Sequence, residues 1–155
     1  MEGDEIRVPT VTVSVEFLLS DGERLAGMIH LSSASRFHEG AETLDEFFNA
    51  RRPFLPVYRA DGRTVLVGRR AIVTVSAPPS SPLVSRLPGR VPGAVHILRV
   101  HLENGDVAEG MLLATLPTQS SRVSDALNQE EEFVPIELTE SVMFVRKDRI
   151  ARIEF

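Results

Sequence analysis

Apolar and polar side chains alternate along the segment from Val11 to Leu19. A period of two places every second side chain on one face, which is typical of a half-buried β-strand. Asp21-Gly22 follows and supplies the positive φ that a tight hairpin needs. The apolar run of residues 25–31 therefore predicts the return strand of an antiparallel hairpin.

This pattern occurs twice. VEFLLSDGERLAGMI, residues 15–29, aligns with LRVHLENGDVAEGML, residues 98–112, and two further blocks align in the same order. Three spacings of five residues recur: Gly22 to Gly27 and Gly105 to Gly110, Asn49 to Phe54 and Asn128 to Phe133, and Val67 to Ile72 and Val145 to Ile150. The sequence therefore predicts an internal duplication, in which matched residues occupy matched positions.

One short helix is predicted in each copy. Thr43-x-x-Glu46 fits a capping box, and its counterpart is residues 123–129. Pro56 and Pro135 follow in the matching phrases FLPV and FVPI, where a proline restricts strand pairing to an edge or a strand start. Two more strands close each copy: residues 64–68 with 71–76, and 142–146 with 149–155. Each copy thus has the elements of a small β-barrel.

The distribution of prolines predicts where the linker between the two copies lies. Residues 77–94 contain five of the ten prolines and predict an extended linker between a first barrel, residues 1–76, and a second, residues 95–155. A unit of about 60 residues is marginal alone, so the copies are expected to pack together or oligomerise. Leu18, Val95 and Ile97 are out of phase with the inward residues of their strands and are the candidate interface. The alternative is that they are ordinary exposed hydrophobic residues.

The two hairpin blocks resemble the start of Sm-like proteins, in which a strand, a Gly-containing turn and a second Gly open a small barrel. VLVGRRAIVTV and MFVRKDRIARI are similar to the closing hairpin of that family. The resemblance implies a mainly β fold of two tandem Sm-like or SH3-like small barrels, each with a short helical insertion. The combination of SDALN, FVPI and VRKDRI is also similar to an uncharacterised bacterial family of small β domains with a helical insertion, which implies no activity.

The middle section departs from the Sm-like pattern. In that family an Asp-x-x-apolar-Asn run close behind the second Gly helps to hold a nucleotide. Here the run from Asp45 to Asn49 lies far behind Gly27, and its counterpart at residues 124–128 begins with Ser124. We interpret both runs as helix caps and turns, with nucleotide ligands as the alternative.

The composition and the charge of the chain mainly predict where in the cell the protein is found. The chain of 155 residues has 17 basic and 22 acidic residues, a net charge of −5, and no Cys, so it can form neither a disulfide nor a thiolate metal site. Its first residues are acidic, unlike a secretory signal, and no apolar run is long enough to cross a bilayer. We expect a cytoplasmic protein that does not bind membranes.

No motif for catalysis is present. The four histidines have no second ligand at a useful spacing, and Glu130-Glu131-Glu132 is interpreted as a solvated turn rather than a cation site. Nucleophile-elbow, P-loop and dinucleotide-binding motifs are missing. We therefore expect no enzyme activity, no cofactor and no metal.

Basic residues recur in the closing turn of each copy: Arg69, Arg70, Arg146, Lys147 and Arg149. Duplicated positive turns could hold the phosphates of RNA. Against this, the chain is acidic and most of its few aromatic residues lie in apolar patterns, whereas binding of single strands needs exposed rings. The main hypothesis is a non-enzymatic protein-interaction or assembly module that binds another protein or itself. Sm-like RNA binding through the basic turns is the alternative.

Overall fold

The computed structural model describes residues 10–37, 39–79, 96–112, 124, 127, 128 and 130–155. The first series of elements is β1 (Thr10–Leu19), β2 (Arg24–Ser32), α1 (Leu44–Asn49), β3 (Phe54–Tyr58), β4 (Thr64–Gly68), the 3-10 turn η1 (Arg69–Ala71) and β5 (Ile72–Ala77). The second series is β6 (Ile97–Leu102), β7 (Val107–Leu112), β8 (Phe133–Glu137), β9 (Val142–Arg146), the 3-10 turn η3 (Lys147–Arg149) and β10 (Ile150–Glu154).

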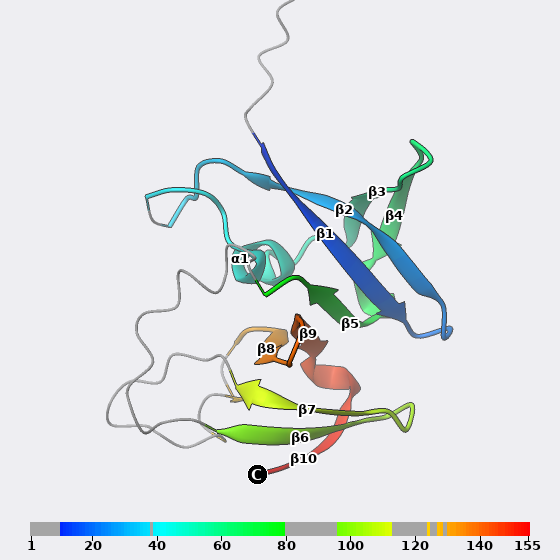
Figure 1. The fold of residues 1–155 in the computed structure, drawn as a ribbon, viewed down its shortest axis with the longest axis vertical. Coiled ribbons are helices and arrows are strands. Elements are labelled where there is room, and N and C mark those ends of the chain that lie inside the picture. Colours follow the sequence, from blue (N-terminus) through cyan, green and yellow to red (C-terminus); the bar gives the residue numbers. More distant parts are fainter. Residues whose placement is uncertain (1–9, 38, 80–95, 113–123, 125–126, 129) are drawn as a thin grey trace, which may run out of the picture.

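The ten strands that the structure describes belong to one antiparallel sheet, in the order β10-β6-β7-β8-β9-β5-β1-β2-β3-β4. The mainly β class predicted from the sequence is therefore confirmed. The sheet is open rather than closed, because β10 and β4 stand at its two ends. The two series also do not form separate sheets, since β5 pairs with β9 between them (Figure 1).

The predicted hairpin turns and the predicted helix cap are confirmed. Gly22 and Gly105 have φ of 87° and 93°, the left-handed region that glycine enters without strain. Thr43 precedes α1, and its Oγ1 accepts a hydrogen bond from the N–H of Glu46 at 3.2 Å. In the closing hairpins the chain forms η1 and η3 instead of a simple turn, so that β5 begins at Ile72 and β10 at Ile150. Of the predicted linker, Ala77 is the last residue of β5, and residues 80–94 lie outside the described residues.

Residues aligned in the sequence pair in the same way in both series. Val15 lies opposite Gly27, as Leu98 lies opposite Gly110. The match extends to further pairs: Phe54 with Gly68 and Phe133 with Arg146, Phe17 with Val75 and Val100 with Ile153, and Leu19 with Ile72 and Leu102 with Ile150. The irregularities also match. The register of β1·β5 shifts between Leu18 and Leu19, and the register of the corresponding pair β10·β6 shifts between Ile150 and Arg152.

Among the described residues the hydrophobic core has two clusters, and each contains residues of both series. The larger is built on the first series and includes Phe133, Val142 and Phe144 from the second. The smaller is built on the second series and includes Leu18 and Val73 from the first. Each half therefore completes the core of the other, which meets the expectation that a unit of this size does not bury enough apolar surface alone.

Candidate functional site

The junction between β5 and β9 is the place where the chain brings its two series together. Val75 lies opposite Phe144 and Thr74 lies opposite Val145, with the strands antiparallel. Val75, Phe144 and Val145 are fully buried. The ring of Phe48 from α1 lies 5.0 Å from that of Phe144 and 5.8 Å from that of Phe133, so α1 covers the junction on one side.

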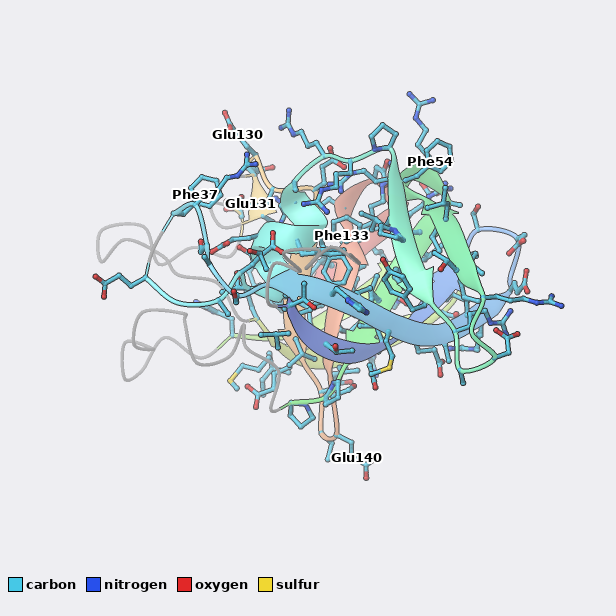
Figure 2. The ribbon with its side chains drawn as sticks, turned by 90° about the horizontal axis from the view of Figure 1, so that it is seen from above. Phe37, Phe54, Glu130, Glu131, Phe133 and Glu140 are labelled. Carbon is cyan, nitrogen blue, oxygen red and sulfur yellow. The ribbon has the colours of Figure 1, made fainter. Side chains whose placement is uncertain are left out.

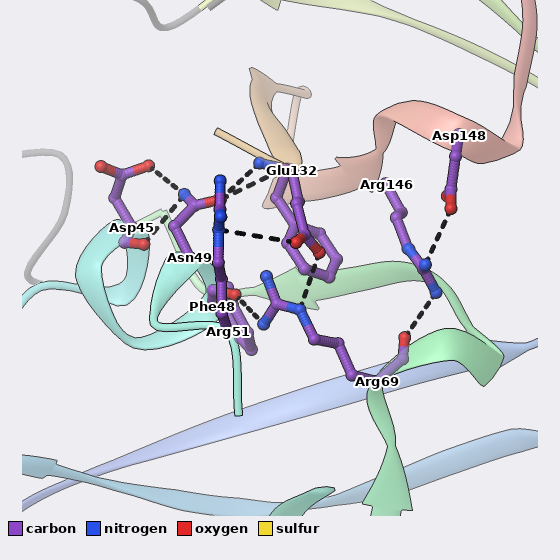
Figure 3. A network of polar contacts seen from close by, with 9 residues as sticks. Asp45, Phe48, Asn49, Arg51, Arg69, Glu132, Arg146 and Asp148 are labelled. Atoms are coloured by element: carbon purple, nitrogen blue, oxygen red, sulfur yellow. Dashed lines mark hydrogen bonds and ion pairs between the residues drawn. The ribbon is translucent and has the colours of Figure 1, made fainter. Parts of the chain in front are cut away.

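Arg69 crosses this junction as a buried cation. It is the first residue of η1, and its backbone N–H donates to the carbonyl of Pro53 at 2.8 Å. Its Nε donates to Oε2 of Glu132 at 2.7 Å, and its Nη1 donates to the carbonyl of Phe48 (Figure 3). The guanidinium also lies over the ring of Phe133, 5.2 Å from the centroid. Ion pairing, hydrogen bonding and ring contact together compensate the desolvation of the charge.

Asn49 joins α1 to the start of β8. Its Oδ1 accepts from the N–H groups of Glu132 and Phe133 at 2.9 and 3.1 Å, across more than half the chain. Its Nδ2 donates to the carbonyl and to Oδ1 of Asp45, both at 3.0 Å. The amide group therefore bonds to the protein's own chain on both sides. Because two of these bonds reach the start of β8, Asn49 links distant segments, a role that its interpretation as a capping and turn residue did not include (Figure 3).

Arg146 and Arg149 reach back from the second series to η1. Nη1 of Arg146 donates to the carbonyl of Arg69 at 2.7 Å, and its Nη2 donates to Asp148 at 2.7 Å. Nη2 of Arg149 donates to the carbonyl of Arg70 at 2.6 Å. We call Asn49, Arg69, Glu132, Arg146 and Arg149 the junction cluster. The two basic turns thus lie against each other instead of facing solvent at separate places.

The five predicted nucleic-acid ligands therefore differ in accessibility. Arg69 and Arg146 are buried, and Arg149 is half-buried with a carbonyl partner. Lys147 is half-buried and also has an interaction within the chain. Arg70 has an exposed side chain. The positive turns predicted from the sequence exist, but most of their donors are directed to groups of the same chain.

Glu132 was not recognised from the sequence. Its neighbours Glu130 and Glu131 are exposed, as a solvated turn requires, whereas Glu132 binds buried Arg69 and also lies 3.8 Å from Nε of Arg51. The interpretation of the whole run as solvated is therefore wrong for this residue. Its partner lies 63 residues away in the sequence, so no local spacing could reveal the pair.

Burial beside the junction cluster shifts the pKa values of two groups, Asp45 and Lys147. Burial raises the pKa of Asp45 above its ordinary value, and the nearby charge of Glu131 acts in the same direction. Burial lowers the pKa of Lys147, although Glu131 and Asp45 oppose this shift. Asp45 and Glu131 therefore repel each other, and the charge of Lys147 attracts both carboxylates.

The predicted interface residues lie in different environments. Leu18 is buried and packs with Leu98, Val100 and Val134, all from the second series. Ile97 is 63% exposed on β6. Val95 lies outside the described residues. Of the three, Leu18 contributes to contact between the halves within the chain, and Ile97 is left as a surface residue.

The surface outside the junction offers little for chemistry. A shallow groove between the series is lined by residues that include Leu18, Thr74, Ser76, Ala108 and Met143. Within the described ranges no three His, Cys, Asp or Glu residues are grouped to hold a metal ion. The helices that the structure describes are too short or too polar to span a membrane. Comparison with protein-family models, curated proteins and solved structures gives no match.

Proposed function

We propose that the protein is a non-enzymatic interaction module, built from two copies of one small Sm-like β unit, that binds a protein partner through the free edges of its sheet. The matched registers support the duplication, since residues aligned by sequence have matched partners in β1·β2 and β6·β7 and in β3·β4 and β8·β9. Two unrelated small β units would not be expected to share both the register of their strand pairs and the position of the register shift in β1·β5 and β10·β6.

The free edge of β4 supports strand pairing as the mode of binding. The N–H of Arg69 donates to the carbonyl of Pro53, so the hydrogen-bonded pairs of β3·β4 are the alternate ones, Leu55 with Val67 and Val57 with Val65. Leu66 belongs to the other set, and its N–H and C=O point away from β3. An edge with unpaired backbone groups can accept another strand.

The RNA-binding alternative has less support. A phosphate site needs cations that are free to approach it, and three of the five proposed ligands donate to carbonyl or carboxylate groups of the chain. The described residues also place most phenylalanines in the core, including Phe17, Phe47, Phe48, Phe133 and Phe144. The exposed Phe54 lies beside the free edge of β4, where it favours a protein contact.

A photo-crosslinking amino acid at position 54 tests this function in the cell of origin. We expect covalent adducts with protein, and we expect Leu66→Pro to abolish them. Proline removes an N–H that β3 does not use and blocks an added strand, while edge positions of this kind tolerate proline. The measurement is mass spectrometry of the purified adducts.

The same crosslinker at position 107 is the matched control, because Val107 is an exposed apolar residue on β7, which has strands on both sides and does not adjoin an end strand. Adducts that persist in Leu66→Pro, that form only from position 107, or that contain RNA instead of protein would contradict the proposal.

A further inference from the structure

The outer face of β2, β3 and β4 presents a contiguous group of apolar side chains. We call it the outer patch, and its members are Met28, Phe54, Pro56, Tyr58 and Leu66. Met28 lies opposite Tyr58, and Leu66 lies opposite Pro56, while the residues that alternate with them on β3 and β4 lie in the core. Four of the eight large apolar residues that are exposed in the described part of the chain belong to this patch. Such a concentration marks a binding surface.

The second series has the same face but buries it. In the matched registers Phe133 has the position of Phe54. Phe144 has the position of Leu66. Phe133 and Phe144 are 1% and 0% exposed, because the ring of Phe48 from α1 lies 5.8 and 5.0 Å from theirs, whereas Phe54 and Leu66 are 61% and 64% exposed. Figure 2 shows Phe133 inside the molecule and Phe54 at its margin. The chain therefore covers one copy of this face with an aromatic side chain and presents the other to solvent.

Arginines surround the outer patch. Residues 51–71 contain six Arg and one acidic residue, Asp61, which lies 3.9 Å from Nε of Arg63. The strands β3 and β4 themselves have no charged residue. Four exposed arginines stand at the two ends of this hairpin: Arg59 and Arg63 at its turn, and Arg52 and Arg70 at its open end. The charge around the patch therefore complements an acidic partner.

A second copy of this chain does not provide the cover that α1 gives to the second series. Phe48 is fully buried in its own chain, and it aligns with Leu127, which packs against the core of its own series. Arg69, whose guanidinium lies over the ring of Phe133, aligns with Lys147. The second series thus has neither the aromatic side chain nor the guanidinium of the first. The outer patch consequently fits a different protein.

We infer that the outer patch binds an acidic segment of a different protein, which places an aromatic side chain on Phe54 and Leu66 as α1 places Phe48 on the second series. The inference rests on the proposed function, because the patch adjoins the free edge of β4, and it names the chemistry of the partner. The aromatic side chain buries apolar surface, and the carboxylates beside it pair with the exposed arginines.

Amide NMR spectra of the full chain test this contact with a defined probe. The probe is a helix-stapled peptide of residues 42–50, ETLDEFFNA, which carries Phe48 together with Asp45 and Glu46. We expect saturable shift changes at the amides of Tyr58 and Leu66. A probe with Phe48→Ala should bind at least tenfold more weakly. Raising the ionic strength from about 0.05 to about 0.5 M should also weaken binding, because salt screens the arginines. Equal binding of the two probes, or shift changes confined to the second series, would overturn the inference.

A substitution within the patch provides the second measurement. Leu66→Glu is expected to weaken binding of the probe at least tenfold, since it puts a carboxylate where apolar surface and an acidic partner meet. Val107→Glu, a change at an exposed apolar residue of β7, should leave binding unchanged. The same spectra show whether each variant is folded, and the comparison of the two probes on the natural chain needs no variant. Unchanged binding to folded Leu66→Glu would refute the inference.

The adducts from position 54 separate this inference from the proposed function. We expect the crosslinked segment of the partner to contain an aromatic residue with Asp or Glu beside it. Adducts with a segment that lacks these residues, or with a second copy of this chain, would overturn the inference and leave the proposed function standing. Binding of the probe without any protein adduct from position 54 would instead contradict the proposed function.

Discussion

Replacing Arg69 by methionine is expected to lower the free energy of unfolding by about 2–3 kcal/mol, because a buried cation is removed while its partners stay. Glu132 loses its 2.7 Å ion pair, and the carbonyl of Phe48 loses its donor. Part of the Glu132 side chain is exposed, so solvent compensates some of the loss and the effect falls below that of a fully buried pair. Denaturant unfolding at equilibrium measures it.

Arg70→Met is the matched control, since the neighbouring side chain is exposed. It is expected to change the free energy of unfolding by less than about 0.5 kcal/mol, as surface substitutions do. Equal effects of the two substitutions would show that Arg69 does not hold the junction. A stable Arg69→Met variant that loses affinity for single-stranded RNA would instead favour the phosphate-binding alternative.

Gly110→Ala is expected to destabilise the protein by about 2–3 kcal/mol through overpacking. A Cβ atom at this position would lie 2.5 Å from the backbone carbonyl oxygen of Glu137 and 2.6 Å from Cγ2 of Ile136. The carbonyl oxygen belongs to β8 and cannot rotate away, so β7 and β8 must separate where they are held by the pairs Met111 with Glu137 and Leu112 with Ile136. Thermal or denaturant unfolding measures the change.

Gly68→Ala is the control for this substitution, because the nearest atom to its Cβ would be Cε1 of Phe54 at an ordinary 3.8 Å. Its φ of −66° suits any residue, so alanine should be neutral or slightly stabilising. Similar losses at both glycines would mean that the close approach of β7 and β8 is not the cause.

The local structure followed from local patterns. Alternation predicted β1, the Asp21-Gly22 and Asn104-Gly105 turns predicted the first hairpin of each series, and Thr43 with Glu46 predicted the start of α1. These elements depend on neighbouring residues, so a single sequence carries the necessary information. The internal spacing also predicted which residues of the two series correspond.

The partners of strands and charges could not be predicted in the same way. Nothing near Ile72 or Val145 indicates that β5 pairs with β9, because both strands satisfy their own hairpin patterns. Arg69 and Arg146 stand in matching hairpin turns and look like solvated tips, until the pairing of β5 with β9 buries them against each other. Such contacts depend on packing between segments that are distant in the sequence. The spacing of residues within one turn does not predict them.

The central claim is that the β5·β9 junction holds the chain together, whereas the free edges of β4 and β10 bind a partner strand. Hydrogen exchange at single amides, measured with and without the partner captured from position 54, tests it most directly. The account predicts slow exchange at Phe144 in the internal junction under both conditions, and exchange at Leu66 that is fast in the protein alone and slows when the partner is added. Rapid exchange at Leu66 under both conditions, or equally rapid exchange at Phe144 in the protein alone, would contradict it.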